Sequence, residues 1–230
     1  MTAHAVPVFY PLRPERGWRP DLAEIASKIT PKTKAILINA PHNPTGGILT
    51  PDDIAGIAAL AASRNLWVIS DEAYEDFQWS GTPVSIGSLP DMHERTISLY
   101  TFSKSFAMTG VRVGYLAIKD AAIRARALKM LLYTATNVSS IAQFGAIGAL
   151  EGGRACIDEF RTELMARRDL FYAGLAERAG GVLTGEKPLG AFYAFAKIDP
   201  AWRSPLPDAS SSPSWAMTEF LIKKGRVGCV

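Results

Sequence analysis

The sequence has 230 residues, of which 48% are hydrophobic and 20% are charged, a composition typical of a soluble globular protein with a real core. The net charge of +3 is small and its basic residues are scattered along the chain, so we expect no nucleic-acid partner. No apolar run approaches the ~20 residues that cross a membrane, so we expect no membrane association.

Apolar runs of strand length alternate with helical segments in the first half of the chain. The predicted elements are a strand at 5–9, a helix at 21–29, a strand at 35–39, a helix from 50 to 63, and strands at 67–70 and 97–100. The run at 35–39 is continuous, which is typical of a strand buried on both faces. Thr50 followed by Pro51 and two acids is typical of a helix start.

Longer helices dominate the second half. The predicted elements are a strand at 113–118, helices at 120–134, 139–150 and 155–179, strands at 182–184 and 191–198, a surface loop at 199–214, a helix at 215–224 and a strand-like run at 226–230. The last strand assignments depend on the β-branched and aromatic residues of these runs.

The alternation of strands and helices favours right-handed crossovers and an α/β fold with a mostly parallel sheet and helices on both faces. In such sheets ligands bind beyond the carboxyl ends of the strands. Asn43, Asp71 and Lys104 each follow one of the buried runs. We therefore expect these three side chains to share one site.

Cysteine and histidine usage excludes further classes of protein. Cys156 and Cys229 form neither a disulfide framework nor a CxxC motif, which fits a reducing compartment. The histidines at 4, 42 and 93 lack the spacing of metal ligands, so we expect no metal site. The chain does not begin with a signal segment, and we expect a cytoplasmic protein.

The stretch 98–115 carries the most informative chemistry. A strand-like run ends at small hydroxyl residues, and Lys104 follows directly. A lysine in a partly dry pocket loses proton affinity and becomes a nucleophile or a Schiff-base former. Arg112, eight residues later, offers a planar guanidinium that could hold a phosphate.

Three motifs at 39–46, 71–74 and 98–115 resemble, in their order and separation, those of the class I/II aminotransferases, pyridoxal-phosphate enzymes of fold type I. The resemblance extends from about Val6 to the end of the chain. It implies that Lys104 forms the Schiff base with pyridoxal 5′-phosphate and moves the substrate proton. It also implies that Asp71 keeps the pyridine nitrogen of the cofactor protonated.

The same resemblance implies roles for the remaining candidates. Asn43 and Tyr74 would donate hydrogen bonds to the phenolic oxygen of the cofactor. Arg112 would anchor the phosphate, helped by the hydroxyls of Thr101 and Ser103.

Purely structural alternatives remain open for these residues. Asp71 or a hydroxyl residue could cap a turn, and Tyr74 could be a core aromatic. Asn43 could serve only turn formation, and Arg112 could form a salt bridge at a strand edge.

The resemblance further implies a cofactor-binding large domain at 1–150, a linking helix at 151–180 and part of a small C-terminal domain at 181–230. The strand at 113–118 would run antiparallel. Family members carry an upstream phosphate-binding loop and a downstream arginine for the substrate carboxylate. Neither is evident here, so we interpret the chain as a fragment truncated at both ends.

The intact enzyme would move an amino group from an L-amino acid to a 2-oxo acid in amino acid metabolism or biosynthesis, as a homodimer. A pyridoxal-phosphate-dependent C–S β-lyase or related lyase remains an alternative, because the motifs bind the cofactor without dictating the reaction. A non-catalytic effector domain of a transcription regulator is a further alternative. The fragment alone could be inactive.

Overall fold

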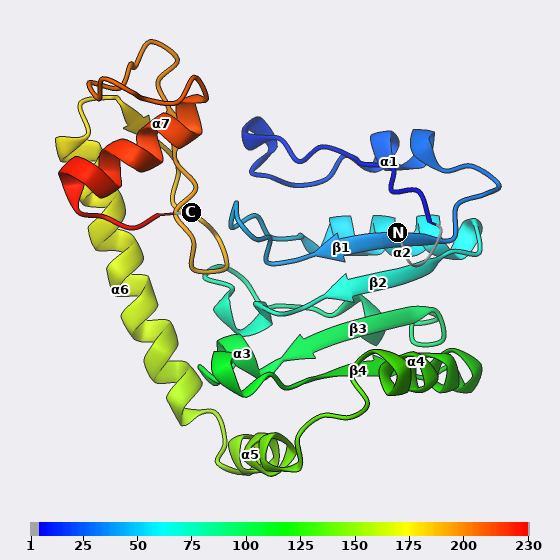
Figure 1. Cartoon of the computed structure of the whole chain (residues 1–230). Helices are drawn as coiled ribbons and strands as arrows, with labels where there is room; N and C mark the ends of the chain where they lie inside the picture. Colours follow the sequence, from blue (N-terminus) through cyan, green and yellow to red (C-terminus); the bar gives the residue numbers. More distant parts are fainter. Residues whose placement is uncertain (1–4, 230) are drawn as a thin grey trace. The chain divides into compact units, whose positions relative to one another are not determined.

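Four apolar runs form one sheet in the computed structural model, which describes residues 5–229 (Figure 1). Its strands, in spatial order, are β1 (Ala35–Asn39), β2 (Trp67–Asp71), β3 (Thr96–Thr101) and β4 (Gly114–Ile118). β1, β2 and β3 are parallel, whereas β4 is antiparallel to β3, as expected. Asn39 pairs with Asp71 and Asp71 with Leu99, so the parallel strands end side by side. The predicted α/β class with a mostly parallel sheet is confirmed.

The predicted helices are present, with ends that shift by a few residues. The α-helices of the described part are α1 (Leu22–Lys28), α2 (Pro51–Ser63), α3 (Phe102–Ser105), α4 (Ala121–Thr134), α5 (Ser140–Glu151), α6 (Ala155–Arg178) and α7 (Pro213–Phe220). Short 3₁₀ turns lie at Pro14–Arg16, Glu75–Phe77, Ile86–Ser88 and Thr109–Val111, and a π-helical turn, Leu221–Gly225, continues α7.

The start of α2 follows the sequence prediction closely. The Thr50 hydroxyl accepts from the Asp53 N–H, and the Asp53 carboxylate accepts from the Thr50 N–H, so a complete capping box is present. Arg19 adds two hydrogen bonds to the same carboxylate, at 2.7 and 2.9 Å. Asp53 is therefore buried and fully bonded, and it fixes the end of the loop that follows β1.

Only one face of β1 is buried. Ile36 and Ile38 pack with Ile57 and other residues of α1 and α2 in the main core. Side chains alternate along a strand, so Leu37 points to the opposite face, where it is 59% exposed. The expectation that this strand is buried on both faces is wrong for the described residues, because no helix of this part covers Leu37.

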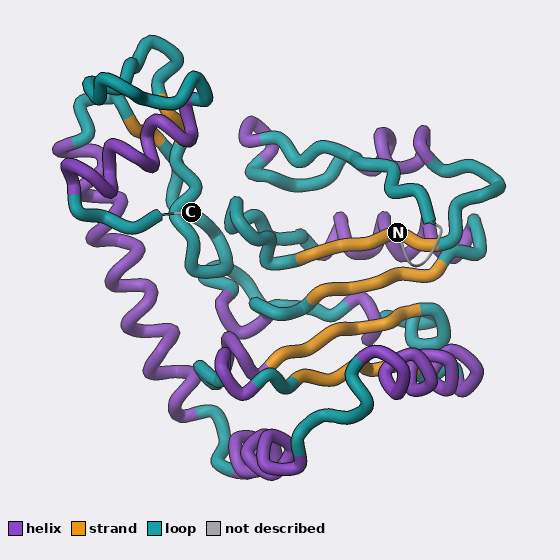
Figure 2. Tube along the Cα trace, in the orientation of Figure 1, coloured by secondary structure: helices purple, strands orange, loops and turns teal. Residues whose placement is uncertain are grey.

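Three strand predictions fail in whole or in part. Residues 5–9 are a loop (Figure 2) in which Val6 and Phe9 are exposed, since no neighbouring strand among the described residues pairs with them. Within the run 191–198 only β6 (Lys197–Ile198) is a strand, paired antiparallel with β5 (Leu183–Thr184). The end of the chain, 226–229, is irregular, and Val230 lies outside the described residues.

The chain forms two compact units. The first extends to Met165 and also includes Pro188–Ala194, whereas Ala166–Lys187 and the chain from Phe195 onward form the second. The change of unit falls inside α6. The predicted three-part division at residues 150 and 180 stays a prediction. No helix of the described residues has the length and apolar character needed to span a bilayer.

Candidate functional site

The loop after β1 is tied to the end of β2. The Ala40 N–H donates to the Asp71 carbonyl at 3.2 Å, and the Asn39 side-chain amide donates to the same oxygen at 3.4 Å. The Asn39 side-chain oxygen in turn accepts from the Asn43 N–H at 2.9 Å. These bonds place Asn43, which is exposed, at the strand edge where Asp71 ends β2.

Asp71 and Tyr74 occupy the turn that follows β2. One carboxylate oxygen of Asp71 accepts from the Ala73 N–H at 3.1 Å, so the capping alternative describes part of its role. The second oxygen accepts no hydrogen bond from the described residues. Tyr74 is buried at 3% exposure. Burial raises the pKa of its hydroxyl, and the Tyr193 hydroxyl and the charge of Asp71 raise it further.

Lys104 lies on α3, directly after β3. The Thr101 hydroxyl caps this short helix by accepting from the Ser103 N–H at 3.1 Å. The Lys104 Nζ lies 5.5 Å from the centre of the Tyr74 ring and 5.6 Å from that of Phe192. The amine thus faces the two aromatic rings, within the range of a cation–π contact.

Arg112 ends the turn before β4, with a left-handed backbone (φ 59°) and an exposed side chain. Its guanidinium donates to the Thr109 carbonyl at 2.8 Å, and the Thr109 hydroxyl donates to the Ser103 carbonyl at 3.0 Å. No carboxylate of the described residues forms an ion pair with Arg112. The strand-edge salt bridge is therefore not present, and most of the guanidinium donors remain available.

Phe192 and Tyr193 belong to this site, and the sequence interpretation missed both. The Tyr193 hydroxyl makes a short hydrogen bond with the Tyr74 hydroxyl and accepts from the Asn43 side-chain amide at 3.4 Å. Because residues 191–198 are predicted as a strand, the sequence alone does not place these two aromatic residues at the site. The one available signal was Gly190, a residue that permits close approach of backbones, immediately before the aromatic pair.

Close backbone contact holds the aromatic pair in place. The N–H groups of Leu189 and Gly190 both donate to the Gly46 carbonyl, at 3.1 and 2.9 Å. Gly46 has a φ of 72°, and a Cβ there would lie only 2.2 Å from the Pro188 Cβ. A residue larger than glycine would push Pro188–Ala194 away from the loop that carries Asn43.

A family model, Aminotransferase class I and II, matches residues 2–227 of this chain. The chain belongs to this aminotransferase family.

Its relatives in the family are longer proteins. An aromatic-amino-acid aminotransferase 2 of Thermococcus litoralis is 38% identical over 96% of this chain and 54% of its own length. An aspartate aminotransferase of Pyrococcus abyssi is 40% identical over 84% of this chain and 49% of its own length. The structure of an aromatic aminotransferase from Pyrococcus horikoshii superimposes with a TM-score of 0.86 at 38% identity, over 97% of this chain and 57% of that one. The chain thus spans about half the length of these relatives.

Aminotransferases of this family depend on pyridoxal 5′-phosphate, and the groups gathered at the strand ends fit that molecule. Lys104 offers an amine for the aldehyde, and Asp71 offers a free carboxylate oxygen for the pyridine nitrogen. The side chains of Tyr74 and Asn43 are donors suited to the phenolic oxygen, and the guanidinium of Arg112 is suited to the phosphate.

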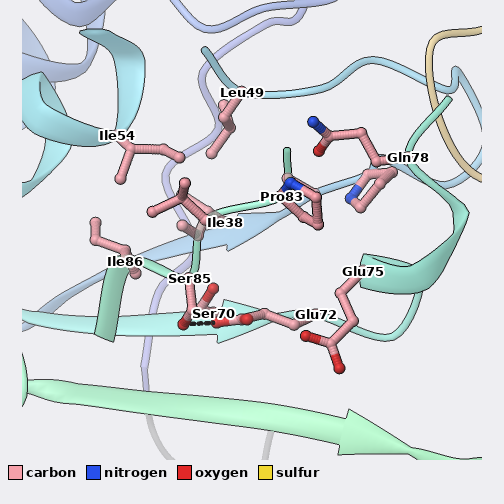
Figure 3. Close-up of a pocket in the computed structure, with 13 residues that line it drawn as sticks. Ile38, Leu49, Ile54, Ser70, Glu72, Glu75, Gln78, Pro83, Ser85 and Ile86 are labelled. Carbon is pink, nitrogen blue, oxygen red and sulfur yellow. Dashed lines mark hydrogen bonds between the residues drawn. The ribbon is translucent and has the colours of Figure 1, made fainter. Parts of the chain in front are cut away.

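A small cavity of about 80 Å³ is lined by residues of β1, β2 and α2 and of the loops that follow the two strands (Figure 3). Both carboxylate oxygens of Glu72 accept hydroxyl bonds, from Ser85 at 2.6 Å and from Tyr100 at 3.1 Å. Glu75 also lines the cavity, and burial, together with the charges of Asp76 and Glu72, raises its pKa to about 7. Both oxygens of Glu72 are engaged there, whereas one oxygen of Asp71 accepts no hydrogen bond from the described residues.

Proposed function

We propose that this chain carries the cofactor site of a pyridoxal-phosphate-dependent aminotransferase that moves an amino group from an L-amino acid to a 2-oxo acid. The observation that carries the proposal is the grouping of Asn43, Tyr74 and Lys104 beyond the ends of three adjacent parallel strands. Their order along the chain is the one that the family motifs have. The aminotransferase names of the relatives support the reaction class.

When bound, pyridoxal phosphate supplies an aldehyde that forms a Schiff base with an amine, and a ring that accepts electrons from the substrate α-carbon. In our proposal the Lys104 Nζ would be that amine, and it would also move the proton at the substrate α-carbon. The Asp71 carboxylate holds a proton at the pyridine nitrogen. The Tyr74 hydroxyl and the Asn43 amide donate to the phenolic oxygen.

The phosphate is held, in this proposal, by the Arg112 guanidinium with the hydroxyl of Ser103. Thr101 contributes mainly by capping α3, because its hydroxyl already accepts from the Ser103 N–H. That cap orients the turn that carries Lys104. A guanidinium without a carboxylate partner is well suited to a dianion, since its planar donors match the phosphate oxygens.

The amino acid substrate is left at the level of an L-amino acid. Relatives named for aromatic amino acids and for aspartate match this chain at similar identity, 38% and 40%. The side-chain specificity therefore belongs to residues other than the shared motifs.

We further propose a cytoplasmic homodimer that acts in amino acid biosynthesis. Two free cysteines, Cys156 and Cys229, fit a reducing compartment. None of the residues of α4 is buried, and on α5 the side chain of Phe144 is 74% exposed. Apolar helix surfaces of this kind are suited to burial between subunits.

The test is the near-visible absorption spectrum of the purified chain with pyridoxal phosphate, compared with Lys104→Ala. We expect a band that requires Lys104 and bleaches when an amino acid is added. Lys129→Ala, at an exposed position on α4, is the matched control and should keep the band. An equal band in Lys104→Ala would contradict the role of Lys104. A folded wild-type chain without any band would mean that binding requires more of the protein than these residues.

A further inference from the structure

Tyr193 contacts two site residues that lie far away in the sequence. Its hydroxyl accepts from the Asn43 side-chain amide and shares a short hydrogen bond with the Tyr74 hydroxyl. Its ring packs edge-on against the Tyr74 ring, at a centroid distance of 5.6 Å and an angle of 72°. The Phe192 ring, 5.2 Å from the Tyr193 ring, completes the aromatic wall beside Lys104.

We propose that Tyr193 is a positioning residue of the cofactor site, whose hydroxyl links the Asn43 amide to the Tyr74 hydroxyl and holds both groups in place for the cofactor. The proposal rests on the proposed function, because it assumes an acceptor beyond Tyr74. It adds to that function a residue that touches both phenolic-oxygen donors and acts through them.

The donor inventory fixes one of these two hydrogen bonds. The Asn43 side-chain nitrogen can only donate, so the Tyr193 oxygen accepts from it. Between Tyr193 and Tyr74 either hydroxyl can donate, and in both cases the short hydrogen bond ties the two oxygens together. The Tyr193 hydroxyl therefore holds the Asn43 amide and the Tyr74 hydroxyl close to one another.

The link fixes the positions of both donors. A side chain that is held by a hydrogen bond and by ring contacts keeps the geometry that a donor to the cofactor requires. Asn43 has a second amide hydrogen, so it can serve Tyr193 and the cofactor at once. Loss of the Tyr193 hydroxyl would weaken both donors without touching the cofactor itself.

Tyr193→Phe tests this proposal, because it keeps the ring contacts and removes only the hydroxyl. A weaker donor leaves more negative charge at the phenolic oxygen, which then holds the neighbouring Schiff-base proton more tightly. We expect the pH midpoint of the visible band of the bound cofactor to rise by about 0.5 to 1 pH unit. Tyr115→Phe, which removes an exposed hydroxyl without a hydrogen bond among the described residues, should leave the midpoint unchanged.

A double-mutant cycle separates positioning from a general structural effect. If Tyr193 acts through Tyr74, Tyr193→Phe should cause a much smaller shift when Tyr74→Phe is already present. An equal shift in both backgrounds, or no shift in the wild-type background, would overturn the proposal.

A measurement without cofactor keeps this test distinct from that of the proposed function. The Tyr74 hydroxyl should titrate above the usual tyrosine range in the wild-type chain, since burial and Tyr193 both raise its pKa. Ultraviolet titration, with Tyr74→Phe to assign the signal, should give a lower pKa in Tyr193→Phe. An unchanged Tyr74 pKa would overturn the hydroxyl link, even in a chain that binds no pyridoxal phosphate.

Discussion

Gly46→Ala probes the contact that brings Tyr193 to the site, and Gly17→Ala provides a matched control. Both glycines have a left-handed backbone, with φ of 72° and 63°. An alanine there carries a backbone cost of about 1–2 kcal/mol at either position. Alanine also restricts the unfolded chain, but this contribution is shared by both variants and cancels in their comparison.

Only Gly46 adds a steric cost. A Cβ at Gly17 meets no atom within 4 Å, whereas at Gly46 it would lie 2.2 Å from the Pro188 Cβ and 2.7 Å from the Gly190 carbonyl oxygen. Relief of this overlap requires Pro188–Ala194 to move, which breaks two backbone hydrogen bonds to the Gly46 carbonyl. At about 1 kcal/mol for each bond, we expect Gly46→Ala to cost roughly 3–4 kcal/mol in total, against about 1–2 for Gly17→Ala.

Urea unfolding followed by circular dichroism measures the loss in free energy of unfolding for each variant. We expect the slope of this free energy against urea concentration to stay unchanged. Tyrosine titration of the same samples should give a Tyr74 pKa closer to the ordinary value in Gly46→Ala only, because Tyr193 leaves with its segment. Equal free energies of unfolding for the two variants, with an unchanged Tyr74 pKa, would refute the close approach of Gly46 and Gly190.

Two further predictions concern carboxylate side chains. Because the pKa of Glu75 is raised from 4.5 to about 7, the folded state binds its proton more tightly, so the stabilisation is present below pH 4.5 and is lost as the pH rises through 7. Between about pH 5 and about pH 8 the wild-type chain should therefore lose on the order of 1–2 kcal/mol of its free energy of unfolding, a value discounted for the partial exposure of Glu75. Glu75→Gln should not show this loss, and identical pH profiles for the two chains would contradict the prediction. Asp53→Ala removes the capping box and the Arg19 pair, and it should lower the free energy of unfolding by about 2–3 kcal/mol in urea titrations. Asp52→Ala, at the exposed neighbouring position, should change it by less than about 0.5 kcal/mol, and similar losses for both would argue against the cap.

The elements that the sequence predicted well are those fixed by local chemistry. β1 keeps the predicted bounds, 35–39, because a short run of β-branched and apolar residues favours an extended chain. The start of α2 was predictable because Thr50 and Asp53 satisfy each other's backbone within one turn. The family and its cofactor could be recognised because the motifs are short and contiguous.

The errors concern contacts between distant parts of the chain. Residues 5–9 have the composition of a strand, but composition does not supply the partner strand that a ladder requires. Residues 191–196 have high β propensity, yet the fully buried Ala191 packs with Tyr74 and Phe77. Tyr193 was missed for the same reason, since its role depends on how closely Gly46 and Gly190 approach.

The return of Pro188–Ala194 to the first unit has a consequence for the order in which the protein is made. Asn43 and Tyr193 are separated by 150 residues, and the second unit begins between them. The ribosome therefore synthesises the four strands, Asn43 and Tyr74 long before it synthesises the tyrosine that links these two side chains. The candidate site around Lys104 is complete only when the seven residues Pro188–Ala194 contact the Gly46 loop. No single cleavage point can separate the two units without dividing one of them.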